Sequence, residues 1–346
     1  MTLHAGGTGV LRSAPARGLL LLGLLAALVV CIAVGFAVGS RDLSLSAVWA
    51  VLAGGGDPEA RAILLDQRIP RTLIAVVGGA ALAVAGVVIQ GHTRNPLADP
   101  GLLGVTAGAS LFVVIAIAFF GITAPAGFLW FAFAGAALAA TIVTVLGRVA
   151  GGRRDSSPAT LVLAGTAISA VLAAISGIIL LLSSSTLDVY RFWTVGSLSG
   201  NHDLSQLAPA FVFIGIGLVI AIGHGSTLDA LSLGDDTARS LGRNLGRSRI
   251  VGLTAVTLLT GGAVALCGSI GFVGLIAPHL VRLLVGPGHR WLLPFSTLVG
   301  GMLVLAADTI GRIIILPAEM PVGVVLAMVG APAFLAILVQ TRRARA

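Results

Sequence analysis

Residues 69–91 read IPRTLIAVVGGAALAVAGVVIQG, a run of 23 residues that contains a single charge, Arg71. About 20 apolar residues are enough for a helix to cross the hydrocarbon core of a bilayer. Inside that core the backbone must satisfy its own hydrogen bonds, which only helices and closed barrels achieve. The run therefore predicts a membrane-spanning helix.

Similar runs recur along the whole chain and suggest about ten spans. Besides 69–91, they cover residues 18–39, 101–120, 127–148, 159–182, 206–224, 249–269, 272–285, 292–313 and 321–340. The run 272–285 is short, contains Pro278 and follows a glycine-rich stretch, so we expect a broken or half-length helix there. Residues 78–86 (GGAALAVAG) and 261–268 (GGAVALCG) resemble each other on spans of opposite direction, which suggests an inverted repeat.

The composition of the 346 residues supports an all-α polytopic membrane protein. Hydrophobic residues make up 57% of the chain and charged residues 10%, whereas soluble domains are about 25% charged. The 47 glycines and the low aromatic content of 5% favour closely packed helices over an outer-membrane barrel with aromatic girdles. We interpret residues 1–346 as a single transmembrane domain.

The distribution of arginine predicts the orientation of this domain. All 21 basic residues are arginines, and an inward N-terminus places fifteen of them on the cytoplasmic side and six outside. Tails 1–17 and 341–346 are then cytoplasmic, and topology explains the net charge of +8 without a nucleic-acid partner. Because the chain has no lysine, it cannot form a P-loop, so any ATP hydrolysis belongs to another chain.

Two polar segments interrupt the spans. Residues 40–68 form an outer loop, in which residues 43–52 suit a short interfacial helix. Residues 225–248 are the longest polar segment on the cytoplasmic side, and we expect two short surface helices there.

Several charged residues need an explanation in a membrane protein. Arg68 and Arg71, three residues apart, share a face just outside the second span, where they either snorkel or dock an acidic external partner. Asp308 lies four residues before Arg312, which predicts an ion pair within one helix. We expect Glu319 to be a solvated loop charge. No spacing typical of metal ligands or of a catalytic pair occurs, so we expect no metal site and no enzymatic activity.

A series of motifs resembles the FecCD-type permeases, the membrane subunits of type II ABC importers for iron-siderophores, haem and cobalamin. In chain order these motifs are RIPRTL, TRNPLADPGLLGVTAGA, SLGDDTARSLG, GSIGFVGLIAPHLVRLLVG, AADTIGR and PVGVVLAMVGAPAFLAIL. The resemblance covers residues 17–340. Its RFW stretch (Arg191–Trp193) and PGLLGV are closest to siderophore permeases. Here Gly288 stands where the family often has an aspartate before His289.

The resemblance implies a role for particular residues. Arg68, Arg71 and Arg312 would dock glutamates on the two lobes of a periplasmic or lipid-anchored substrate-binding protein. Asn95, Pro96 and Leu97 would form a cytoplasmic gate. The segment 225–248 would enter the cleft of an ABC ATPase dimer, with contacts from the following five residues: Asp235, Asp236, Ala238, Leu241 and Gly242.

The same resemblance implies a bacterial inner-membrane location and a second permease, identical or homologous. No cofactor is expected in this chain, because the partner ATPase would bind Mg-ATP. Haem or cobalamin is the alternative cargo to an iron-siderophore. A secondary transporter driven by ions would need buried acidic residues, and only Asp308 comes close. An intramembrane enzyme would need a catalytic pair, which the sequence lacks.

Overall fold

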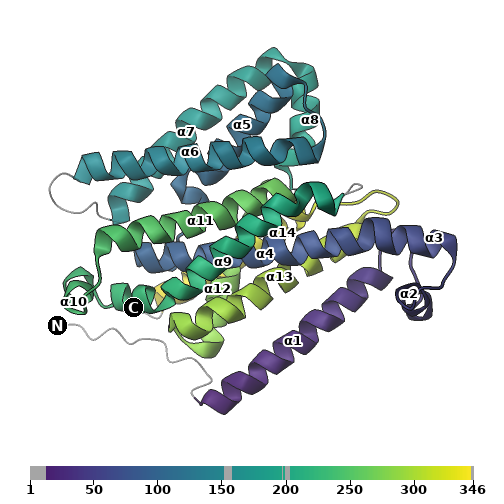
Figure 1. Cartoon of the computed structure of the whole chain (residues 1–346), viewed down its shortest axis with the longest axis horizontal. Coiled ribbons are helices and arrows are strands. Elements are labelled where there is room, and N and C mark those ends of the chain that lie inside the picture. Colours follow the sequence, from purple (N-terminus) through teal and green to yellow (C-terminus); the bar gives the residue numbers. More distant parts are fainter. Residues whose placement is uncertain (1–12, 152–157, 197, 199–202, 344–346) are drawn as a thin grey trace.

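The computed structural model describes residues 13–151, 158–196, 198 and 203–343, and every regular element among them is helical (Figure 1). Ten helices occupy the ten predicted runs. They are α1 (Ala14–Ala37), α4 (Ile69–Thr93), α5 (Val105–Phe120), α6 (Pro125–Gly151), α7 (Pro158–Leu182), α9 (Leu204–Ser232), α11 (Leu245–Cys267), α12 (Val273–Val285), α13 (His289–Ile314) and α14 (Val322–Arg343).

Seven of the described helices are long and apolar enough to cross a membrane. Helices α5, α12 and α14 contribute shorter apolar segments. Helix α12 has 13 residues with Pro278 inside, which confirms the predicted short helix. The chain is therefore a multi-pass helical membrane protein, as the composition predicted.

Helix α4 is at the centre of the bundle and is the most buried of the long helices. It packs against α9, α11, α12 and α13, while α5, α6 and α7 form a layer beyond α11 (Figure 1). Helices α1 and α7 leave most of their residues uncovered by the rest of the chain. Helix α4 is thus surrounded by its own chain, whereas α1 and α7 each present a largely uncovered apolar surface.

Close helix packing around α4 depends on small residues. A Cβ atom added at Gly79 would overlap the carbonyl oxygen of Gly300 on α13, and one at Gly86 would overlap that of Gly274 on α12. The two proposed repeat segments also lie against each other, because Gly78 faces Cys267 of α11. Without these glycines the backbones could not approach so closely.

The polar segments contain short helices. Residues 40–68, predicted to form an outer loop, hold α2 (Leu45–Leu52), as expected, followed by α3 (Pro58–Arg61) and a π-helical stretch, Ala62–Arg68. A further short helix, α8 (Ser184–Thr194), follows α7.

The predicted pair of short helices in residues 225–248 is wrong. Helix α9 continues to Ser232, one short helix, α10 (Asp235–Ser240), follows, and α11 already begins at Leu245. Polar composition marks the part of a helix that leaves the membrane, but it does not require the helix to end there. The segment is therefore an α-helical extension of two spans joined through α10.

Candidate functional site

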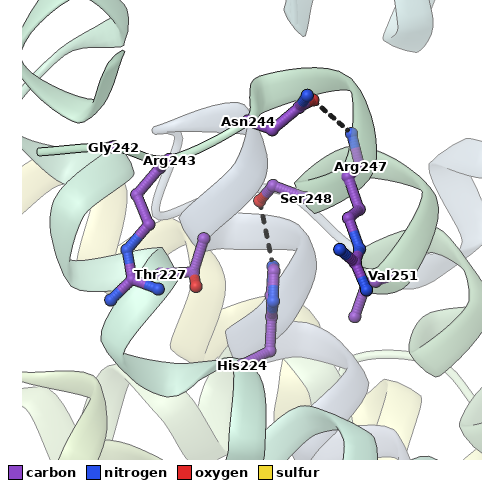
Figure 2. A pocket seen from close by; sticks show the side chains of 8 residues that line it. All are labelled: His224, Thr227, Gly242, Arg243, Asn244, Arg247, Ser248 and Val251. Atoms are coloured by element: carbon purple, nitrogen blue, oxygen red, sulfur yellow. Dashed lines mark hydrogen bonds between the residues drawn. The ribbon is translucent and has the colours of Figure 1, made fainter. Parts of the chain in front are cut away.

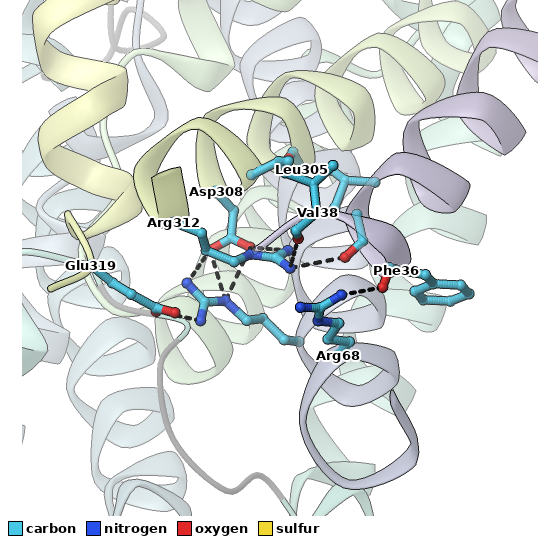
Figure 3. A network of polar contacts seen from close by, with 10 residues as sticks. Phe36, Val38, Arg68, Leu305, Asp308, Arg312 and Glu319 are labelled. Atoms are coloured by element: carbon cyan, nitrogen blue, oxygen red, sulfur yellow. Dashed lines mark hydrogen bonds and ion pairs between the residues drawn. The ribbon is translucent and has the colours of Figure 1, made fainter. Parts of the chain in front are cut away.

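The end of the bundle at which α4 begins holds a largely buried cluster of three arginines and two carboxylates (Figure 3). Asp308 on α13 is 1% exposed and accepts hydrogen bonds from two guanidinium groups. Arg71, in the first turn of α4, contacts Asp308 at 2.8 Å, and Arg312 contacts it at 2.7 Å. The predicted ion pair between Asp308 and Arg312 is confirmed. Because charges in an apolar interior need partners, this carboxylate ties α4 to α13.

The remaining contacts of the cluster fix the end of α1. Arg312 donates to the carbonyl oxygens of Gly35 and Val38, at 2.9 and 3.3 Å. Arg68 donates to the carbonyls of Phe36 and Ala37, and also to that of Arg41. The last carbonyls of a helix lack partners within it, so these two cations cap α1 and complement its dipole.

Glu319 is the second carboxylate of the cluster. It accepts a hydrogen bond from Arg71 at 2.6 Å and is 26% exposed, so the expectation of a solvated loop charge is wrong. Three guanidinium groups and two carboxylates leave the cluster with one net positive charge. The structure thus brings Arg68, Arg71 and Arg312 together at one end, as predicted, but engages them with groups of the same chain.

The opposite end of α4 carries the predicted gate. Arg94, in the left-handed conformation at φ 50°, ends the helix, and the Asn95 side chain accepts a hydrogen bond from the Leu97 amide at 3.0 Å. Asn95 and Pro96 are exposed, and Leu97 is partly exposed. We call residues 95–97 the gate turn.

Gln90 links the residue that follows the gate turn, Ala98, to helix α12. Its amide nitrogen donates to the carbonyls of Ala98 and Gly274, at 3.3 and 3.0 Å, and its oxygen accepts from Arg282 at 2.7 Å. Gln90 is 4% exposed. Sequence reasoning gave it no role, although a buried amide in an apolar run is itself a signal of a structural or functional constraint.

Arg94 also connects the gate turn to α10. Its Nε donates to the carbonyl of Leu231 at 2.8 Å, and its Nη2 forms an ion pair with Asp235. Arg249 approaches the same carboxylate at 4.0 Å. The sequence did not reveal this link, because Arg94 and Asp235 are separated by 141 positions.

The five expected ATPase contacts differ in exposure. Asp236, Leu241 and Gly242 are exposed, and Asp235 is partly exposed beside Arg94. Ala238 is completely buried in the core, so its expected contact with a partner is wrong; it anchors α10 to the bundle instead.

A cavity of about 300 Å³ lies between the end of α9 and the start of α11 (Figure 2). Asn244 caps α11 by accepting from the Arg247 amide at 3.0 Å, and Ser248 lies 3.2 Å from the ring of the buried His224. Arg243 and Arg247 also line the cavity (Figure 2). This surface is therefore cationic.

Comparisons with known proteins agree with this architecture. The chain is 42% identical over 328 residues to the ferric enterobactin transport system permease protein FepD of Escherichia coli (strain K12), covering 95% of this chain and 96% of FepD. It is 39% identical over 332 residues to the hemin transport system permease protein HmuU of Yersinia pestis, covering 94% and 97%. The solved inward-facing conformation of a metal-chelate type ABC transporter matches with a TM-score of 0.81 at 30% identity, covering 93% of this chain and 99% of that chain.

The multi-pass bundle is thus that of a membrane transport protein. The profile of the FecCD transport family matches residues 26–340, and the chain belongs to that family.

Replacing Asp308 by Asn is expected to destabilise the fold by about 3–5 kcal/mol, because Arg71 and Arg312 would lose their shared counterion while remaining buried. Thermal unfolding of the purified chain in detergent measures the effect. Asp188→Asn is the matched control, since Asp188 pairs with Arg191 on an exposed surface. Equal unfolding midpoints for the two variants would contradict the role given to Asp308.

Proposed function

We propose that the chain is the membrane-spanning permease subunit of an ABC importer that carries an iron-siderophore complex across the bacterial cytoplasmic membrane. The observation that carries this proposal is the match to FepD over nearly the full length of both chains. Haem is the second candidate cargo, because HmuU matches almost as extensively. A separate ATPase would hydrolyse ATP, and this chain would have no enzymatic activity of its own.

The translocation pathway would lie between two permeases, identical or homologous. Helix α7 supports this arrangement, because only 11% of its most apolar window is buried by its own chain. The cluster of Arg68, Arg71 and Arg312 would face outward, with both termini in the cytoplasm.

Coupling to the ATPase would pass through α10. In this proposal Asp236, Leu241 and Gly242 contact the ATPase, while Asp235 transmits the movement of α10 to Arg94 and thus to the gate turn. Closure of the ATPase dimer would shift α10 and bias the bundle between two states. The direct contact between Arg94 and Asp235 supports this route.

Docking of the substrate-binding protein would use the outer cluster. Of the two carboxylates bound to Arg71, Glu319 is 26% exposed and Asp308 1%. An incoming glutamate would therefore exchange with Glu319, while Asp308 keeps the cluster together. Bidentate contacts between arginine and carboxylate would fix the orientation of the partner.

Uptake in a strain that lacks this gene tests the cargo. The panel is radioiron-loaded siderophores, labelled haem and labelled cobalamin, with and without the gene restored. Restored uptake of a ferric siderophore alone is expected. Restored uptake of haem alone or of cobalamin alone would identify that compound as the cargo instead of a siderophore. If the protein is expressed and uptake of no compound is restored, all three classes of cargo are excluded.

Glu319→Gln is expected to tighten docking about two- to tenfold, because it removes the internal competitor for Arg71. Arg71→Gln is expected to weaken docking. The affinity of the purified binding protein for the importer in nanodiscs at low salt is the measurement. Glu59→Gln is the control, since Glu59 pairs with the exposed Arg41 in the outer loop. Unchanged affinity in both the Glu319 and Arg71 variants would exclude the cluster as the docking point.

A further inference from the structure

A second cavity, of about 420 Å³, lies beside the gate turn at the end of the bundle that we propose to be cytoplasmic. It is open to one side and is lined by the ends of α4, α9 and α12 and by the start of α13. The polar side chains in its lining are those of Gln90, Arg94, Asp229, Ser232, Arg282 and His289, and Gly288 lies among them.

Two of the charged groups in this lining already have partners. Arg94 pairs with Asp235 outside the cavity. Asp229 accepts from the backbone amide of His289 at 2.9 Å and lies 2.7 Å from its ring nitrogen Nδ1. Asp229 is the one carboxylate in the lining. Among the described residues, Asp229 forms an ion pair with His289 and none with Arg282.

Arg282, the third charged side chain discussed here, has no ion-pair partner among the described residues. Its Nη2 donates to Gln90. Its Nη1 is buried and has no hydrogen-bond partner. A largely buried guanidinium without a counterion is costly, because both its charge and its N–H groups have lost water. The adjoining cavity has room for the missing anion.

The chemistry of the group defines the ligand. Guanidinium presents several N–H donors in a plane and binds phosphate oxygens strongly, often in pairs. The start of α13 also lines the cavity, but Asp229 already engages it by accepting a hydrogen bond from the His289 amide at 2.9 Å. The charge of Arg282, which has no ion-pair partner among the described residues, is therefore the feature that favours an oxyanion over a cation or a neutral ligand.

We propose that this cavity binds a phosphate-type oxyanion with Arg282 as its counterion. The phosphate belongs either to the headgroup of an anionic phospholipid or to a soluble phosphate. Because Arg282 also holds Gln90, which in turn holds the carbonyl of Ala98, the bound anion would stiffen the connection that follows the gate turn.

The test uses the full chain and two variants of the site. Arg282→Gln removes the charge. Gly288→Asp places a competing carboxylate in the cavity; a Cβ there meets no atom within 4 Å, and aspartate is favourable at the start of a helix. Arg290→Gln is the control, because Arg290 is exposed next to the cavity.

Thermal unfolding is followed in two arms at fixed pH. One arm titrates potassium phosphate against potassium chloride at matched ionic strength in detergent. The other compares nanodiscs of phosphatidylcholine with and without phosphatidylglycerol. We expect the unfolding midpoint of the wild type and of Arg290→Gln to rise with phosphate or with phosphatidylglycerol. The half-maximal anion concentration should increase at least about tenfold in the two site variants.

The two arms identify the source of the phosphate. A rise with phosphatidylglycerol alone indicates a lipid headgroup, and a rise with soluble phosphate indicates a free ion. The absence of any anion-specific rise in the wild type would overturn the proposal, as would an undiminished rise in Gly288→Asp. If Arg282→Gln does not fold, Gly288→Asp decides. Because the readout is stability, it is independent of whether the chain transports a siderophore.

Discussion

The carboxylate of Asp308 makes the interaction on which one half of the structure, around the start of α4, depends. It is 1% exposed and binds both Arg71 and Arg312, so α4 and α13 are joined at a point where neither charge could remain alone. Arg312 then reaches the end of α1, and Arg71 reaches Glu319 before α14. One buried acid thus organises four helices of an otherwise apolar bundle.

Helix α4 connects this cluster to the opposite end of the bundle. It begins next to Arg68, runs through the most buried part of the core and ends at Arg94, beside the gate turn. Small residues bring its backbone against α12 and α13, which leaves little room for bending. In the proposed mechanism, a displacement at one end of α4 would reach the other end, and Arg94 would pass it on to α10.

The sequence predicts the helices well, because crossing a bilayer requires long apolar runs that can be read directly. It also places Arg68, Arg71 and Arg312 on one side and pairs Asp308 with Arg312, four residues away on one helix. The contacts of Glu319 with Arg71 and of Arg94 with Asp235 could not be predicted, since they join positions far apart in the chain. The polar segment 225–248 was misjudged because composition reports contact with water rather than backbone conformation.

In the proposed mechanism, Arg94 and Asp235 transmit movement between the ATPase contact and the gate turn. A charge-exchange cycle in the assembled importer tests it most directly, with the number of substrate molecules imported per ATP hydrolysed as the readout. Arg94→Asp and Asp235→Arg should each lower this ratio, and the double variant should recover much of it. The same exchange at Asp188 and Arg191, an exposed pair within α8, should have little effect. Unchanged ratios in the single variants, or a double variant no better than either, would contradict the account.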